Sequence, residues 1–295
     1  MAADIALHSD HKAALGECPQ WDERTASLWM MDCRKGEIYQ IDADGTAHLR
    51  HRACPPCGSF ALLEDGGVLV AEKEAIIHLT DDGHRHEIAR MAESLPDLRF
   101  NDGACMADGS FVLGSMHINR APGEAPQGGI YRLDRDGTFR RLAPGLGVAN
   151  GPCISPLDGR LHICDSTARL IWSHALDQDG NLSDARVFAD TAALDSAPDG
   201  CAFDDQGGLW TALVHAGAIV RFTPDGNISD RIDLPMAHPT AICFGGPAMD
   251  QIHVTSISDS GRLRADGPFD GRIITITGTG YRGFARPRFD LQKGN

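Results

Sequence analysis

Four oxygen-bearing side chains occupy matching positions in a sequence repeat. Each is the first residue of its copy and is called the head of that copy below. They are Glu17, Asn101, Asn150 and Asp199. Carboxylate and amide oxygens are the ligands that hard divalent cations such as Ca²⁺, Mg²⁺ and Mn²⁺ prefer. Two carboxylates balance the charge of one dication, and neutral amide oxygens fill further positions. If the fold brings the four together, the sequence predicts a divalent-cation site built from oxygen.

The repeat occurs six times, at intervals of roughly 40–50 residues, which is the range of propeller blades. Weaker copies of its head residue are Gly58 and Thr240. Because equivalent positions in a repeat take equivalent places, six heads around a ring point to one axis. Gly58 has no side chain, so we expect it to leave coordination positions open for water and substrate. The alternative reading of the Asn-Gly and Asp-Gly pairs is ordinary turn chemistry.

Short segments rich in β-forming residues follow the heads, among them 27–31, 111–113 and 209–213. Asp-Gly pairs between later segments are typical of tight turns, and no stretch has a sustained helical period. The spacing predicts an all-β, six-bladed β-propeller with a central channel metal site, as a single domain over residues 1–295. The segment around Ile5–Leu7 is expected to pair with the last blade and close the ring.

Charge and apolar runs exclude several classes of partner. The formal net charge is −14, whereas nucleic acids and anionic membranes attract basic surfaces. No apolar run approaches the ~18 residues of a membrane helix. The N-terminal residues have no basic flank followed by an apolar stretch, so no signal peptide is predicted. We expect a cytoplasmic protein, as a monomer or small homo-oligomer, that binds a small molecule.

The nine cysteines are an odd number, which favours reduced thiols. Cys54 and Cys57 form the only CxxC pair, and without a second pair at zinc spacing they indicate a structural loop. Four others recur just after repeat heads and are predicted to be small, buried packing residues. They are Cys105, Cys153, Cys201 and Cys243.

Competing catalytic sets are absent from the sequence. No serine stands in Gly-x-Ser-x-Gly, and there is neither a His-Glu-x-x-His motif nor a glycine-rich phosphate loop. His162 and His253 occupy corresponding strands of their repeats and are predicted to be core or edge residues.

Five motifs, in order over essentially the whole chain, resemble the senescence marker protein / regucalcin / gluconolactonase-like family. They are Leu15–Pro19, Arg99–Gly103, Asn150–Pro152, Pro198–Gly200 and Cys243–Pro247. The resemblance implies a six-bladed propeller that holds one divalent cation and hydrolyses sugar lactones.

The positions within these motifs indicate which residues of this chain correspond to the family's site residues. Glu17, Asn150 and Asp199 match the metal ligands. Asn101 matches a residue beside the metal, and Arg99 matches an arginine that contacts substrate. Asp199 also matches the residue proposed as general base in this family.

One segment departs from the family pattern. Where relatives often contact substrate through an acidic or polar side chain, this chain offers His117 and Asn119, so the lactone cannot be transferred from the family. Residues 120–129 are interpreted either as a loop over the channel mouth or as a plain interblade loop.

The sequence thus predicts a metal-dependent sugar lactonase that opens an aldonolactone to the aldonic acid. A divalent cation polarises a carbonyl or activates water, and Asp199, with Glu17 as the alternative, would accept the proton. Arg99 suits sugar hydroxyls. The cation is left open among Ca²⁺, Mn²⁺, Zn²⁺, Mg²⁺ and Fe²⁺. Alternatives are a phosphotriesterase-like hydrolase, a non-enzymatic calcium-binding or regulatory propeller, and a protein-binding propeller with a structural ion.

Overall fold

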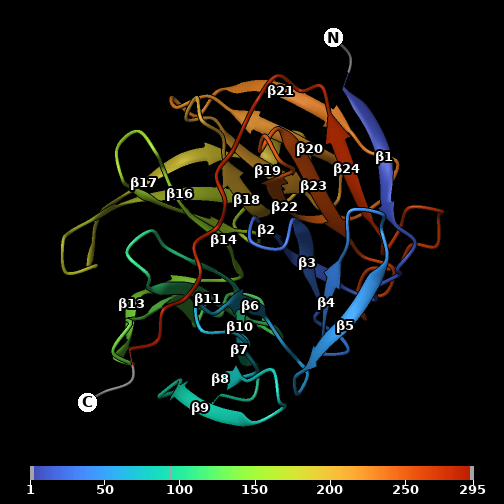
Figure 1. Cartoon of the computed structure of the whole chain (residues 1–295). Helices are drawn as coiled ribbons and strands as arrows, with labels where there is room; N and C mark the ends of the chain where they lie inside the picture. Colours follow the sequence, from blue (N-terminus) through green and yellow to red (C-terminus); the bar gives the residue numbers. More distant parts are fainter. Residues whose placement is uncertain (1–2, 94, 293–295) are drawn as a thin grey trace.

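Six four-stranded sheets stand side by side around a ring in the computed structural model, which describes residues 3–93 and 95–292 (Figure 1). The first strand of each sheet contacts the first strands of both neighbouring sheets, so the ring is closed. The six-bladed propeller predicted from the repeat is therefore confirmed. The single helical element among the described residues is a 3₁₀ turn, η1 (Ala192–Leu194). None of their helices is long and apolar enough to cross a membrane.

Each blade is one sheet, whose four strands follow one another from the centre of the ring to its rim. The inner strands are β2 (Gly16–Asp22), β6 (Ser59–Leu62), β10 (Leu98–Cys105), β14 (Ala149–Ile154), β18 (Pro198–Phe203) and β22 (Pro239–Gly245). The second strands are β3 (Ser27–Asp32), β7 (Val68–Ala71), β11 (Phe111–His117), β15 (Leu161–Asp165), β19 (Leu209–Leu213) and β23 (Gln251–Ser256). The third strands are β4 (Glu37–Ile41), β8 (Ala75–Leu79), β12 (Gly128–Leu133), β16 (Leu170–Leu176), β20 (Ala218–Phe222) and β24 (Ile273–Thr277). The outer strands are β5 (Ala47–Arg52), β9 (Arg85–Arg90), β13 (Phe139–Leu146), β17 (Leu182–Asp190), β21 (Ile228–Asp233) and β1 (Asp4–Ser9).

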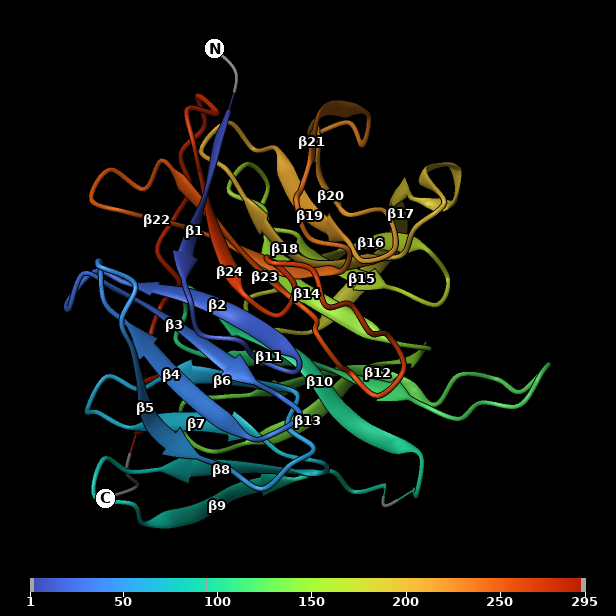
Figure 2. The same cartoon turned by 90° about the vertical axis from the view of Figure 1, so that its right-hand side faces the viewer.

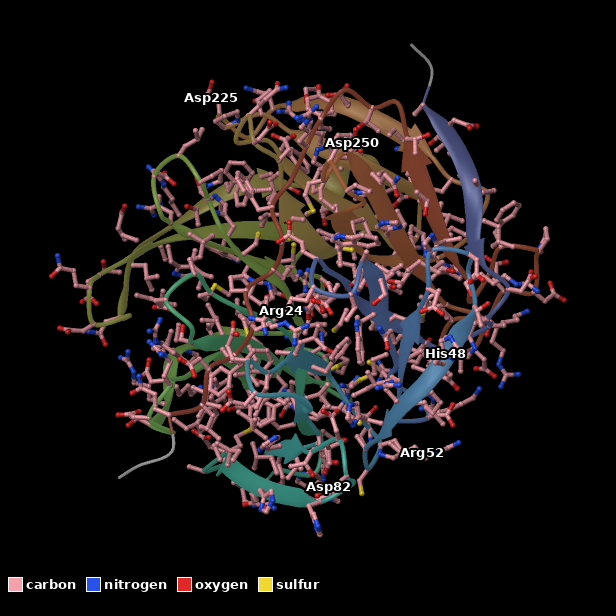
Figure 3. The ribbon with its side chains drawn as sticks, in the orientation of Figure 1. Arg24, His48, Arg52, Asp82, Asp225 and Asp250 are labelled. Carbon is pink, nitrogen blue, oxygen red and sulfur yellow. The ribbon has the colours of Figure 1, made fainter. Side chains whose placement is uncertain are left out.

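The two ends of the strand order meet in the sixth blade. β1 pairs with β24 in antiparallel register, with Ile5 opposite Ile276 and Leu7 opposite Ile274. The expected ring closure by the segment around Ile5–Leu7 is confirmed. Elsewhere the charged side chains favour the outside, and exposed residues such as His48, Asp82 and Asp225 lie at the periphery (Figure 3).

Glycines let successive inner strands approach each other closely. A Cβ built on Gly58 would fall 2.5 Å from the carbonyl oxygen of Asn101, and one on Gly200 would fall 2.5 Å from the Cβ of Ala241. Any larger residue would therefore push two blades apart. No side chain fits at Gly58, because the backbone of the neighbouring inner strand fills the space beside it; that this position leaves coordination positions open stays a prediction.

Most inner strands change register directly after the repeat head. The shift lies between Glu17 and Gln20 in β2, and between Asn150 and Cys153 in β14, with similar shifts in β10, β18 and β22. Such bulges re-aim side chains and often occur beside functional sites. The head-and-glycine pairs therefore belong to bulged inner strands and not to hairpin turns. Asp-Gly turns occur instead between third and fourth strands, where Gly45 has a φ of 86°.

The C-terminal segment crosses the face of the ring that Figure 1 shows, as a red trace. Its backbone bonds first to the fifth blade, where the Asp205 N–H donates to the Arg282 carbonyl at 2.7 Å. It then reaches the second blade, where the Glu64 N–H donates to the Phe289 carbonyl at 2.9 Å. Phe289 is fully buried. The segment thus ties blades together across the ring.

The cysteines are free throughout the described chain, as predicted. Cys105, Cys201 and Cys243 are buried and Cys153 is half-buried. The sulfurs of Cys164 and Cys201 lie 3.5 Å apart.

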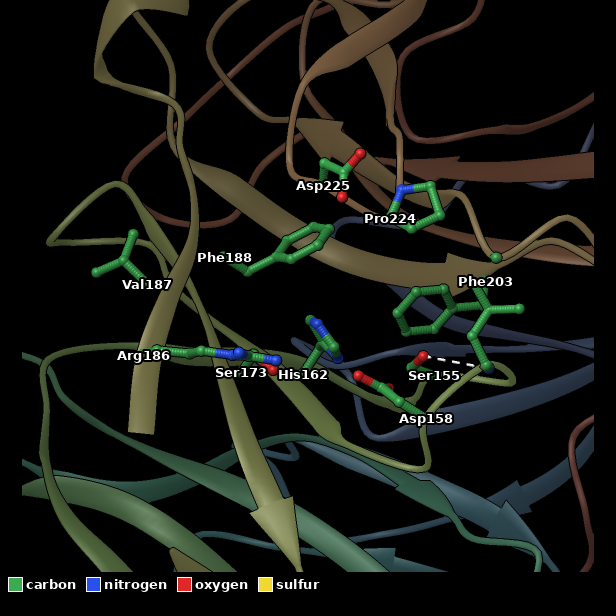
Figure 4. A pocket seen from close by; sticks show the side chains of 12 residues that line it. Ser155, Asp158, His162, Ser173, Arg186, Val187, Phe188, Phe203, Pro224 and Asp225 are labelled. Atoms are coloured by element: carbon green, nitrogen blue, oxygen red, sulfur yellow. Dashed lines mark hydrogen bonds between the residues drawn. The ribbon is translucent and has the colours of Figure 1, made fainter. Parts of the chain in front are cut away.

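His162 and His253 occupy second strands, opposite Cys153 and Cys243 respectively. The ring of His162 lies edge-on to Phe188 beside a cavity of about 330 Å³ between the fourth and fifth blades (Figure 4). Burial lowers the pKa of His162 to about 4, and burial beside His8 lowers the pKa of His253 to about 3. Both histidines are therefore neutral, buried packing residues, as predicted.

Buried neutral histidines make stability depend on pH. The unfolded chain binds a proton near pH 6.5, whereas folded His162 does so only near pH 4, so stability is lost as pH falls between these values. For one such residue the loss from pH 7 to pH 5 is on the order of 1–2 kcal/mol. We expect the free energy of unfolding of His162→Gln to fall less between pH 7 and pH 5 than that of the wild type, as measured by urea unfolding at pH 7, 6 and 5. The exposed-site variant His84→Gln should keep the wild-type slope; equal slopes for all three proteins would contradict the assignment.

Candidate metal centre and active site

The predicted ligands lie at one end of the central channel because each stands near the start of an inner strand. Glu17, Asn150 and Asp199 are the second residues of β2, β14 and β18, and Asn101 is the fourth residue of β10. The structure brings two of them into direct contact, since Asn101 Nδ2 donates to Asn150 Oδ1 at 2.5 Å. Asn101 Nδ2 also donates to the Ala149 carbonyl at 3.0 Å.

A serine that the sequence analysis did not identify orients the Asn150 amide. Asn150 Nδ2 donates to Ser166 Oγ at 2.8 Å, and Ser166 Oγ donates to the Pro198 carbonyl at 2.7 Å. Ser166 therefore fixes which end of the amide carries the oxygen. The carbonyl of Pro198 immediately precedes Asp199, so the same contact links two candidate ligands. No repeat or motif marks Ser166, because its role depends on a contact between blades.

Three carboxyl groups share this end of the channel. Burial raises the pKa of Glu17 well above its usual value, and the nearby carboxylates of Asp199 and Asp102 raise it further, while Arg99 opposes the shift. Burial also raises the pKa of Asp199, again with a contribution from Asp102. Negative charge is thus concentrated in a poorly hydrated place, where it is unfavourable unless a cation compensates it.

The donors around these carboxylates are few. Among the described residues, the hydrogen bonds acting on Glu17 and Asp199 come from the backbone N–H groups of Cys18 and Gly200, and from no side chain. The half-buried carboxylate of Glu17 and the buried carboxylate of Asp199, each without a side-chain donor from the described residues and beside an oriented amide oxygen, fit a divalent cation. No group of three His, Cys, Asp or Glu side chains in the described chain is placed to hold a metal, so Asn150 is essential to this set.

Asp102 is the carboxylate that sequence reasoning left without a role. It is 5% exposed, and all its acceptor positions face the protein. Its Oδ1 accepts from the Gly103 N–H at 2.7 Å and from Cys18 Sγ at 3.3 Å, and its Oδ2 accepts from the Gly151 N–H at 2.8 Å. Asp102 therefore ties the first, third and fourth blades together beneath the predicted ligands. In the sequence, Asp102 could have been noticed as an acidic residue directly after the head Asn101.

The two remaining heads have structural roles. Thr240 is fully buried and donates to the Gly16 carbonyl at 2.5 Å, which joins the sixth blade to the first. Gly58 is the close-packing position described above. Four of the six heads therefore belong to the polar site, and two make packing contacts between blades.

Arg99 lies half-buried at the same end. Its Nη1 donates to the Phe100 carbonyl at 2.9 Å and approaches Asn101 Oδ1 at 3.4 Å. Neither acceptor is a carboxylate, so the remaining guanidinium donors are available to a ligand.

The two other predicted substrate residues lie at the channel mouth on the third blade. The side chain of His117 is 8% exposed, and its Nε2 lies 3.8 Å from Glu124 Oε1. Asn119 is exposed and engaged at both ends, because its Nδ2 donates to Asp97 Oδ1 at 2.6 Å and its Oδ1 accepts from Arg262 at 3.0 Å.

Arg262 reaches this place from the opposite blade. It belongs to the segment between β23 and β24, and its guanidinium donates to the Ile118 carbonyl at 2.6 Å as well as to Asn119. The contact bridges the sixth and third blades over the mouth. In Figure 2 the green loop between β11 and β12 extends outward from the ring. It connects two strands of one blade, so the interblade interpretation of residues 120–129 is wrong.

Comparison with known proteins adds a family to this geometry. A family model, the SMP-30/Gluconolactonase/LRE-like region, matches residues 15–258. The L-arabinolactonase of Azospirillum brasilense is 32% identical over 293 residues, which cover 98% of this chain and 96% of that protein. The 6-deoxy-6-sulfogluconolactonase of Pseudomonas putida is 30% identical over 94% of this chain and 95% of its own length.

A solved structure has the same fold. It is regucalcin from Agrobacterium tumefaciens str. C58, described as a calcium-binding protein, with a TM-score of 0.85 and 25% sequence identity over 96% of each chain. The matched region includes every predicted ligand. The chain therefore belongs to the SMP-30/gluconolactonase/LRE-like family, as its five motifs predicted.

Proposed function

We propose that the protein is a divalent-metal-dependent sugar lactonase, which hydrolyses an aldonolactone to the aldonic acid. The observation that carries the proposal is the pair of donor-poor carboxylates, Glu17 and Asp199, beside the oriented Asn150 amide. Support for a lactone substrate comes from relatives named L-arabinolactonase and 6-deoxy-6-sulfogluconolactonase, which align over almost the whole chain. One cation is proposed, and its identity stays open among Ca²⁺, Mn²⁺, Zn²⁺, Mg²⁺ and Fe²⁺.

Glu17, Asn150 and Asp199 are the proposed ligands. When bound, a divalent cation supplies Lewis-acid stabilisation of the charge that develops on oxygen during ester hydrolysis. The protein's own contribution is to place acid–base and hydrogen-bonding groups around the lactone. Asp199 is proposed to take a proton from the attacking water as general base, through a carboxylate oxygen that the cation holds loosely.

The reaction balances with water as the only co-reactant. The water oxygen bonds to the lactone carbonyl carbon, the bond from that carbon to the ring oxygen breaks, and Asp199 passes its proton to the departing oxygen. The products are one hydroxyl and one carboxylic acid on the same molecule. Glu17 is the alternative base because its carboxylate lies at the same end of the channel.

Sugar hydroxyls are the groups that the surrounding donors suit. Arg99, Asn101 and His117 are proposed to bind them, since each presents polar atoms at the channel end. Asn119 is also proposed to contact substrate. Its amide, like that of Asn101, is engaged at both ends within the protein, so each would offer a further lone pair of its amide oxygen. Asn119 in addition holds Arg262 over the mouth. A non-enzymatic calcium-binding function remains the second candidate, because the solved relative named regucalcin is described as calcium-binding.

Metal removal tests the requirement for a cation. We expect chelation to abolish release of acid from an aldonolactone, and a divalent cation to restore it, in a pH-indicator assay over pentono- and hexonolactones. Because the pKa values of Glu17 and Asp199 are raised, protons compete with the cation, and its affinity should fall as pH decreases. Titration calorimetry at pH 8, 7 and 6 measures this trend. Unchanged activity after chelation would refute the metal requirement, whereas cation binding without activity on any of these lactones would favour the non-enzymatic calcium-binding alternative.

Substitution of the ligands tests their assignment. Glu17→Gln, Asn150→Ala and Asp199→Asn should each lower kcat/KM by about 10²–10⁴-fold, as loss of a ligand or base does. Circular dichroism should stay unchanged, since these side chains line the channel end instead of filling the core. The peripheral variant Asp225→Asn is the matched control and should keep full activity. Wild-type kcat for Asp199→Asn at saturating cation would exclude Asp199 as the base.

Arg99→Ala separates sugar recognition from chemistry. We expect about a tenfold or greater loss of kcat/KM on polyhydroxylated lactones, because a charge-assisted hydrogen bond is removed. The loss on a bare aliphatic lactone of the same ring size should be much smaller. Equal losses of kcat/KM on both substrates would show that Arg99 does not bind the sugar hydroxyls.

A further inference from the structure

A second cavity, of about 400 Å³, lies at the channel end opposite the candidate metal centre. Its walls are the final residues of β10, β14, β18 and β22 and the loops that follow some of them, and residues 284–287 of the crossing C-terminal segment complete it. The volume is within the range of small-molecule sites in proteins. Nothing in the proposed hydrolysis uses this cavity.

The lining is mainly apolar and aromatic. Phe203 and Phe244 come from inner strands, and Phe284 comes from the crossing segment. Phe284 is 54% exposed, an unusual state for a large aromatic side chain beside a cavity. Thiols from four inner strands, which are free and small, make up much of the remaining wall.

One cation, Arg286, lines this apolar cavity. Within the described residues its guanidinium has neither a hydrogen bond nor a carboxylate partner. Burial raises the pKa of Cys105, Cys153 and Cys243, and the positive charge of Arg286 opposes this rise on all three of these inner strands. A group that acts on strands around the ring lies near the channel axis. The Arg286 side chain is half-buried, and its guanidinium lines the cavity within electrostatic reach of these strands.

We infer that this cavity binds an aromatic carboxylate, whose carboxylate pairs with Arg286 and whose ring packs against Phe203, Phe244 and Phe284. The planar guanidinium matches a carboxylate through two parallel hydrogen bonds. An unpaired cation among apolar side chains is costly, and an anionic ligand removes this cost. A neutral apolar ligand would leave the cost in place.

The cavity is separate from the proposed catalytic end. Along the four inner strands that line the cavity, the head lies two to four residues before the cysteine, as in Asp199 to Cys201 and Asn101 to Cys105. At about 3.3 Å per residue of extended chain this is at most roughly 7–13 Å, because the bulge of each strand lies in this interval. The inference therefore does not depend on lactonase activity.

Calorimetric titration of the full chain with 2-naphthoate tests the inference, with 2-naphthalenemethanol as the neutral analogue. We expect one saturable site for the acid. Arg286→Met should lower the affinity for 2-naphthoate by about tenfold or more and leave the affinity for the alcohol unchanged. Arg286→Lys should retain part of the affinity for 2-naphthoate. Ala285→Phe, which fills the cavity, should abolish binding of both compounds. Circular dichroism and thermal melting establish that each variant is folded.

Two controls separate this site from the metal centre. Glu17→Gln should bind 2-naphthoate as the wild type does, and Arg286→Met should keep the wild-type kcat/KM on whichever aldonolactone the wild type hydrolyses. The inference is overturned if 2-naphthoate does not saturate the protein, or if Glu17→Gln loses binding that Arg286→Met keeps. A protein without lactonase activity that still shows Arg286-dependent binding would refute the proposed function alone.

Discussion

The close approach of successive inner strands is the constraint on which the rest of the structure depends. Gly58 lies against the backbone of Asn101, and Gly200 lies against Ala241, with no space for a further methyl group. This contact sets the width of the channel, and the width determines whether side chains on different blades can share one ion. The bulges after the heads then turn those side chains toward each other. The arrangement of the candidate ligands is therefore a result of backbone packing.

The sequence predicted the fold well because a repeat constrains every blade at once. The heads Glu17, Asn150 and Asp199 could be placed at one channel end from phase alone, and the structure has them there. Their roles as ligands remain predictions. Phase could not distinguish a head that serves the site from one that packs, since Thr240 and Gly58 look equivalent to the others in the pattern. Only their contacts with neighbouring blades separate the two groups.

What the sequence could not supply were contacts between distant segments. Ser166 orients Asn150 through the carbonyl before Asp199, and Arg262 reaches across the mouth to Asn119. Neither residue belongs to a repeat position or a motif. Both act through geometry that exists only when blades are assembled, so local patterns carry no signal for them. Asp102 is intermediate, because its place beside Asn101 was visible while its three-blade contact was not.

Closure of the sixth blade by β1 has a consequence for how the chain reaches its native state. Ile5 finds its partner Ile276 only after almost the whole polypeptide has left the ribosome. Until then the first strand has no ladder to join, and the entropy of closing so long a loop opposes early pairing. The ring should therefore assemble slowly, and the unpaired strand edges of the sixth blade should stay exposed until β1 pairs with β24.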